Sequence, residues 1–189
     1  ADVLGELDDD DAEAILKQLD PEDAADLRRL AQYGPTTAGG LMITEYLHYL
    51  HNQTIDDVLQ DLRAHREMYA EYDVQYVYVT DEQGKLVGVV RMRDLVLAPG
   101  SQRLTSLILK VPTKVSVLDS VDALEDVFDS HPYAAVPVVD DAGVLVGVVR
   151  REAVEESLGE RAEKALLSVG GIIGGQELRT MSLYSRSAR

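Results

Sequence analysis

The chain has 189 residues, of which 46% are hydrophobic and 28% charged, and its formal net charge is −16. A charge of this sign argues against a nucleic-acid partner, because neutralising phosphates requires clustered Lys and Arg. The sequence contains no cysteine, which excludes disulfides, thiolate metal sites and a cysteine nucleophile. Since no apolar run approaches the roughly 18 residues that span a bilayer, we expect the chain as given to be soluble.

The N-terminal segment predicts two short helices with an acidic surface. Residues 1–26 contain eleven acidic side chains and a single lysine, Lys17. Asp11–Leu19 forms the first predicted helix, and the second begins with Asp20 as N-cap and Pro21 at the first helical position. Because so short a segment buries little, we expect residues 1–33 to be the end of a larger helical bundle or a helix pair packed on the rest of the chain.

The rest of the chain repeats one pattern twice, and each copy predicts the order β-α-β-β-α. The expected elements of the first copy are a strand at Tyr46–Leu50, a helix capped by Thr54, the strand QYVYV (75–79), a turn at 81–84, the strand LVGVV (86–90) and a helix from about Met92. Those of the second copy are the strand KVSVL (114–118), a helix capped by Ser120, the strand AVPVV (135–139), a turn at 140–143, the strand LVGVV (145–149) and a helix from about Glu152.

The two copies differ in length between the helix cap and the last strand. Thr54 and Ser120 are 66 positions apart, whereas Gly88 and Gly147 are 59 apart, so the first copy holds seven extra residues, within 64–73. A loop or an extra helical turn would absorb them. Each copy alone would leave one face of a small sheet uncovered, and we therefore expect the two copies to cover each other in an α+β fold with a shared core.

Two motifs resemble those of a known family. VYVTDEQGKLVGVV (77–90) and VPVVDDAGVLVGVV (136–149) are similar to the core of CBS domains, which occur as tandem pairs (Bateman modules). This resemblance implies a module that senses adenine nucleotides or ions and has no catalytic role of its own. No Ser-His-Asp spacing or Walker pattern is present either, so we expect no enzymatic activity.

Two further segments resemble one branch of that family, the MgtE magnesium transporters and channels. TTAGGLMITEYL (36–47) is similar to the segment that joins their N-terminal helical domain to the CBS pair. The basic end, GGIIGGQELRTMSLYSRSAR (170–189), resembles the segment leading from the connecting (plug) helix into the first transmembrane helix, and a basic end fits the cytoplasmic margin of a span.

The resemblance implies the cytosolic regulatory region of a longer protein, at the cytoplasmic face of the inner or plasma membrane. The expected partners are a second copy, which would form a homodimer through the CBS units, and the membrane domain of the same protein. The expected domains are 1–35 (end of the N-domain), 36–101 (first CBS unit), 102–154 (second CBS unit) and 155–189 (connecting helix).

Mg²⁺ is the regulatory ligand that the resemblance implies. This ion is small and octahedral, keeps several waters and takes one or two carboxylates per site, and facing carboxylates repel each other when it leaves. The resemblance makes Asp10, Asp11 and Asp122 candidate metal ligands. Glu152 and Glu156 are further candidates near the connecting helix, because they lie at i and i+4 and hence on one helical face. The alternative is that these acids are solvated helix positions, which for Asp8–Asp11 suits the positive end of a helix dipole.

The chain departs from the family pattern at three acidic positions. One falls at Ala153, and two of the connecting helix fall at Arg161 and Lys164. We therefore expect fewer bound Mg²⁺ ions than the family pattern provides.

A second candidate ligand is ATP. CBS nucleotide sites commonly use Gly-h-h-Ser/Thr-x-x-Asp, where h is hydrophobic, and the corresponding segments here are GVVRMRD (88–94) and GVVRREA (147–153). Arg91 and Arg150 replace the hydroxyl, Asp94 keeps the carboxylate and Ala153 does not. Since an arginine can bind a phosphate, Asp94 and Arg91 are the candidate nucleotide-binding residues. A third alternative is a dimerisation module on which no ligand acts.

Overall fold

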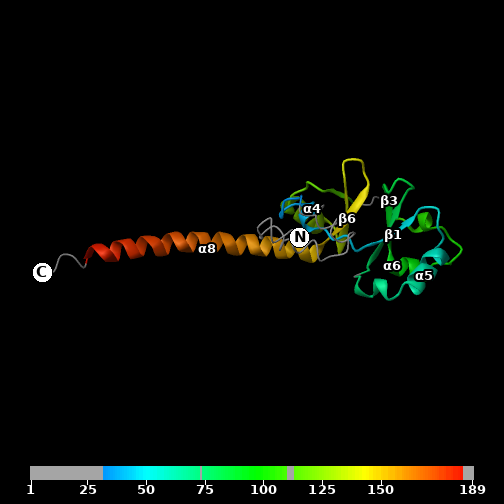
Figure 1. Ribbon diagram of the computed structural model, residues 1–189, viewed down its shortest axis with the longest axis horizontal. Coiled ribbons are helices and arrows are strands. Elements are labelled where there is room, and N and C mark those ends of the chain that lie inside the picture. Colours follow the sequence, from blue (N-terminus) through cyan, green and yellow to red (C-terminus); the bar gives the residue numbers. More distant parts are fainter. Residues whose placement is uncertain (1–31, 73, 110–112, 185–189) are drawn as a thin grey trace, which may run out of the picture. The chain divides into compact units, whose positions relative to one another are not determined.

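The computed structural model describes residues 32–72, 74–109 and 113–184 (Figure 1). The chain divides into two compact units, residues 1–154 and 155–189. The predicted N-terminal helices, with Asp10 and Asp11, lie outside the described residues. The first unit contains two halves, each built around a three-stranded sheet.

The first half has the predicted order of elements. These are β1 (Leu47–Leu50), α5 (Ile55–Ala64), the 3-10 helix η1 (Met68–Glu71), β2 (Tyr76–Thr80), β3 (Leu86–Arg91) and α6 (Met92–Leu97), preceded by the short α4 (Ala38–Leu41) and followed by the 3-10 helix η2 (Leu104–Leu107). β2 lies in the middle of the sheet, parallel to β1 and antiparallel to β3. The extra residues of this half form a turn at 65–67 followed by η1.

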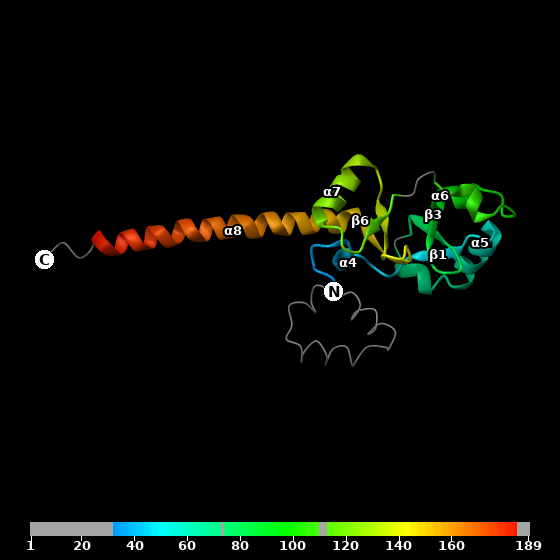
Figure 2. The same ribbon diagram turned by 90° about the horizontal axis from the view of Figure 1, so that it is seen from above.

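The second half repeats this arrangement. Its elements are β4 (Val115–Ser116), α7 (Val121–Ser130), β5 (Ala135–Val139), β6 (Leu145–Arg150) and α8 (Arg151–Tyr184), of which α7, β6 and α8 are labelled in Figure 2. β5 is parallel to β4 and antiparallel to β6. The prediction of a strand over 114–118 was too long. Ser116 and Asp119 close a turn through two hydrogen bonds, of 2.8 and 3.0 Å, so β4 ends at Ser116.

Helix caps form where the sequence predicts them. Thr54 and Asp57 exchange side-chain and backbone hydrogen bonds in a capping box at the start of α5. The Ser120 hydroxyl accepts a hydrogen bond from the Ala123 N–H (3.3 Å) at the start of α7. The apolar faces that follow these caps are buried, at Ile55 and Val58 in α5 and at Val121, Leu124 and Phe128 in α7.

The first sheet is covered on both faces, as expected for two halves that share a core. One face packs against the helices of its own half, with Val77 and Val79 of β2 beside Val58 of α5 and Leu95 of α6. The opposite face contributes Tyr78 and Val89 to a second cluster, which also contains Leu145 and Val148 of β6. The predicted α+β fold with a common core is confirmed.

The two hairpins meet at their turns. Gly84 and Gly143 have φ of +76° and +82°, a backbone region that a glycine adopts without strain. The Leu86 N–H donates to the Gly143 carbonyl (3.2 Å) and the Leu145 N–H donates to the Gly84 carbonyl (3.0 Å). These reciprocal bonds tie the first hairpin to the second.

The segment before each half pairs with the other half. Ile43, which precedes β1, exchanges two hydrogen bonds with Val148 of β6 (2.9 and 3.0 Å). Leu109, which precedes β4, donates its N–H to the Val89 carbonyl of β3 (2.9 Å). We call residues 42–43 and 108–109 the crossing segments, because each places residues that belong in sequence to one half against a strand of the other half.

The repeated LVGVVR supplies the glycine that each crossing segment needs. A Cβ at Gly88 would overlap the side chain of Ile108. A Cβ at Gly147 would lie 2.5 Å from the Met42 sulfur and 3.0 Å from the Ile43 carbonyl oxygen. The same strand sequence therefore occurs twice because, in each copy, a crossing segment packs so closely against the strand that only glycine fits.

Candidate functional site

A cavity of about 120 Å³ lies where both halves contribute strand ends. Tyr46, Tyr76 and Tyr78 supply aromatic walls from the first half, and Arg150 and Glu152 come from the end of β6 and the start of α8. The Arg150 Nε is buried and makes no hydrogen bond with the residues that the structure describes. A buried donor without a partner is costly, so this cavity suits a ligand with an oxygen acceptor.

The predicted nucleotide residues do not line this cavity. Arg91 ends β3, where its side chain is exposed, and Asp94 lies half-buried in the first turn of α6. The Asp94 carboxylate is 3.4 Å from both the Nε and the Nη2 of Arg93. The cavity instead has Arg150, the counterpart of Arg91 in the second copy.

Two of the predicted metal ligands, Asp122 and Glu152, lie at the starts of α7 and α8. Asp122 is in the first turn of α7 and is exposed. Glu152 is also exposed, in the first turn of α8, which the side chain of Arg151 joins to the other end of α7 at Phe128. The six residues from Asp122 to Phe128 correspond to about 9 Å of helix rise, so Arg151 attaches the start of α8 to the end of α7 that lies away from Asp122.

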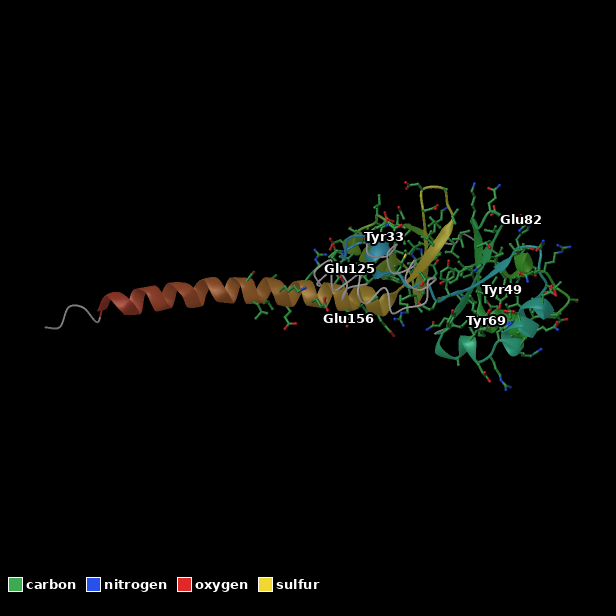
Figure 3. All side chains as sticks on the ribbon, viewed as in Figure 1. Tyr33, Tyr49, Tyr69, Glu82, Glu125 and Glu156 are labelled. Atoms are coloured by element: carbon green, nitrogen blue, oxygen red, sulfur yellow. The ribbon has the colours of Figure 1, made fainter. Side chains whose placement is uncertain are left out.

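The remaining acids do not complete a site among the described residues. Glu156 is exposed on α8 in the second unit (Figure 3), and Asp10 and Asp11 lie outside the described ranges. No group of three His, Asp or Glu side chains in the described part of the chain is arranged to hold a metal ion. Because Mg²⁺ keeps several waters and takes one or two carboxylates, Asp122 and Glu152 each fit as one contributor to a site shared with other residues.

Asp61 of α5, which the sequence did not indicate, has three side-chain hydrogen-bond partners. Its Oδ2 accepts hydrogen bonds from the hydroxyls of Tyr49 (2.6 Å) and Tyr69 (3.1 Å), and its Oδ1 lies 2.8 Å from the His65 Nδ1. The hydrogen bond from Tyr49 lowers the pKa of the Asp61 carboxyl below its usual value. The cluster joins β1, α5 and η1 (Figure 3, where Tyr49 and Tyr69 are labelled), so its role is to hold the extra segment of the first half.

We expect the substitution Asp61→Asn to lower the free energy of unfolding by about 1–3 kcal/mol at pH 7, because it removes a charged acceptor from three donors. A carboxyl whose pKa is lowered on folding stabilises the protein above its unfolded pKa of about 3.9 and loses this effect as the pH falls through the folded value. The difference between wild type and variant should therefore shrink below about pH 4. Urea unfolding at pH 7 and pH 3.5 measures this difference in unfolding free energy. The control is Asp141→Asn, at an exposed position. A difference that stays constant with pH would contradict this assignment.

Family models match most of the chain. The CBS domain matches residues 38–100 and 106–159, and the MgtE intracellular N domain matches residues 1–36. The magnesium transporter MgtE of Thermus thermophilus is 31% identical over 154 residues, which cover 82% of this chain and 34% of that protein. The chain thus spans about a third of the length of this relative.

Two solved structures are similar in both sequence and fold. The cytosolic domain of the Mg²⁺ channel MgtE in complex with ATP matches with a TM-score of 0.72 and 31% identity, covering 77% of this chain and 58% of that one. The soluble part of a magnesium transporter matches with a TM-score of 0.78 and 28% identity, covering 85% and 62%.

Among the described residues, no helix is both long and apolar enough to cross a membrane. The matched segments follow the order that the sequence predicted, with the N domain first and the CBS pair after it. The chain therefore belongs to the CBS-domain family, as a tandem CBS pair that follows a segment of an MgtE N domain, and it is a homologue of the cytosolic regions of MgtE magnesium transporters.

Proposed function

We propose that this chain is the cytosolic Mg²⁺-sensing module that gates an attached magnesium transporter or channel. The observation that carries this proposal is the match to an MgtE N domain and a CBS pair in the same chain. The charge supports it, because a formal net charge of −16 leaves many carboxylates for a divalent cation to neutralise. Bound Mg²⁺ would favour a compact arrangement, and its loss would leave facing carboxylates to repel each other.

The candidate ligands remain Asp10, Asp11, Asp122, Glu152 and Glu156. α7 supports this set, because Asp122, Glu125, Asp126 and Asp129 recur at the spacing of one helical face and are all exposed. In this proposal each site is completed by further oxygen ligands, among them carboxylates of a second copy. The described carboxylates would supply only part of each site.

A second copy and a membrane domain are the proposed partners. Val96 and Leu97 of α6 are 59% and 77% exposed, and two adjacent apolar side chains on one short helix suit a contact with another CBS pair. The proposed location is the cytoplasmic face of the membrane that holds the transporter. We propose no catalytic activity for the chain.

Thermal unfolding with chelator, and then with millimolar Mg²⁺ or Ca²⁺ at constant ionic strength, tests the sensor. A ligand that binds only the folded chain at 100 times its Kd adds about 2.7 kcal/mol. For a chain of this length, this shifts Tm by about 5–11 °C. We expect Mg²⁺ to produce such a shift and Asp122→Asn to reduce it, while Asp141→Asn in the exposed second hairpin turn leaves it intact. Equal shifts in all three proteins would remove Asp122 from the ligand set.

Adenine-nucleotide sensing is the second candidate function. A similar structure contains ATP, and the cavity beside Arg150 has an aromatic lining and an unsatisfied donor. ATP, with EDTA present, is therefore a separate arm of the same experiment. A shift that Asp94→Ala abolishes would assign the nucleotide to the first copy, whereas a shift that only Arg150→Ala abolishes would assign it to the cavity. No shift with either ligand would leave the third alternative, a module that mainly dimerises.

A further inference from the structure

The side chain of Arg151, the first residue of α8, is directed at the end of α7. Its Nη2 donates hydrogen bonds to the carbonyls of Phe128 (2.6 Å) and His131 (2.7 Å), and its Nε donates to the Tyr133 carbonyl (3.0 Å). The guanidinium carbon also lies 4.9 Å from the centre of the Phe128 ring. The Arg151 backbone N–H adds a further bond, to the Ala134 carbonyl (2.8 Å).

These contacts use properties that only arginine combines. The last carbonyls of a helix lack partners within the helix and form the negative end of its dipole, so they attract a cation. The planar guanidinium reaches several acceptors at fixed angles and stacks over an aromatic face, whereas a lysine ammonium is a single flexible point charge. Arg151 therefore fixes the start of α8 to the end of α7 in one defined geometry.

The two helices that Arg151 joins carry the proposed ligands. α7 bears Asp122 near its start and the exposed acids of its outer face. α8 begins with Arg151 and Glu152 and continues to Tyr184. A cation that draws α7 to another part of the protein would also act on the first turn of α8, because the two are fastened together.

We propose that Arg151 is a coupling residue that transmits a ligand-driven displacement of α7 to the first turn of α8. This inference rests on the proposed Mg²⁺-sensing function and deepens it by naming how sensing reaches the connecting helix. Arg151 itself binds no ion, so it acts as a positioning residue. Replacing Arg151 should leave ion binding intact but weaken the response of α8 to the bound ion.

Hydrogen–deuterium exchange of the whole chain, with chelator and with Mg²⁺, tests the coupling. In wild type we expect Mg²⁺ to slow exchange in peptides from α7 and from the start of α8. Arg151→Lys keeps the charge but loses the planar guanidinium. In this variant the Mg²⁺-dependent slowing of exchange should remain in α7, whereas the slowing at the start of α8 should fall by about 5-fold or more. Arg63→Gln, at an exposed position in the last turn of α5, is the control for loss of an arginine.

The outcomes separate a coupling role from a structural one. A merely structural role would raise exchange around α7 and α8 equally with and without Mg²⁺, leaving the Mg²⁺-dependent difference unchanged, and this result would overturn the inference. Arg151→Gln, which also removes the charge, is a second variant for the same test. All proteins are compared well below their own Tm, so that partial unfolding is not mistaken for a loss of coupling. If wild type shows no effect of Mg²⁺ on either helix, the sensing function itself fails, and the coupling fails with it.

Discussion

Replacing Gly147 by valine should destabilise the chain more than any exposed substitution, by about 3 kcal/mol or more. Even a single methyl at this position would contact the Met42 sulfur and the Ile43 carbonyl oxygen too closely. Ile43 cannot retreat without breaking its paired hydrogen bonds to Val148. For a chain of this size, the loss corresponds to a fall in Tm of about 6–12 °C.

The matched control is Gly159→Val on α8. Gly159 is exposed, and a Cβ at this position would have no neighbouring atom within 4 Å. Valine and glycine differ by only a few tenths of a kcal/mol in helix propensity, so this variant should unfold close to wild type. Gly147→Ala should fall between the two, because the Met42 side chain can turn aside from one methyl. Equal urea midpoints for Gly147→Val and Gly159→Val would show that the crossing segment at Met42 and Ile43 does not pack tightly against Gly147 of β6.

Phe128→Ala should cost about 3–5 kcal/mol, the usual range for deleting a buried aromatic side chain. Phe128 is the only phenylalanine of the chain and is 3% exposed, so its removal leaves a cavity beneath α7. The same change removes the ring that lies against the Arg151 guanidinium. Urea unfolding monitored by circular dichroism measures the loss.

Phe128→Leu separates the two contributions. Leucine keeps most of the apolar volume and should cost less than about 1.5 kcal/mol in packing. Any further loss of unfolding free energy measures the contact between the Phe128 ring and the Arg151 guanidinium. This further loss should disappear when Phe128→Leu is compared with its parent in an Arg151→Lys background. A cost for Phe128→Ala below about 1 kcal/mol, well under the usual range, would mean that α7 is held mainly by its other buried residues, Val121 and Leu124.

Local chemistry is the part of this fold that sequence reasoning recovers. The caps at Thr54 and Ser120 and the glycines of both turns depend on residues a few positions apart, so their patterns can be recognised directly. The order of strands and helices follows from the same short-range signals. β4 was the exception, because Asp119 closes a turn at Ser116 that the alternation of apolar residues did not reveal.

Contacts between distant segments could not be predicted in this way. The hydrogen bond from Tyr49 to Asp61 and the bonds from Arg151 to backbone carbonyls have no signature in spacing, because any residue supplies a carbonyl. The candidate metal ligands show the same limit. Both Asp122 and Glu152 were expected at helix starts and are found there, but the side chains that surround each of them depend on how the helices pack and not on either motif.

The crossing segments also determine when the fold can be completed during synthesis. Ile43 leaves the ribosome about a hundred residues before its partner Val148, and until then the inner face of the first sheet, with Tyr78 and Val89, lacks the β6 side chains that pack against it in the fold. Pairings between residues so far apart in sequence make folding slow, and exposed apolar faces of intermediates favour aggregation. The first CBS unit is therefore expected to expose part of its apolar surface until the second has emerged, and neither unit should be a stable product when it is expressed alone.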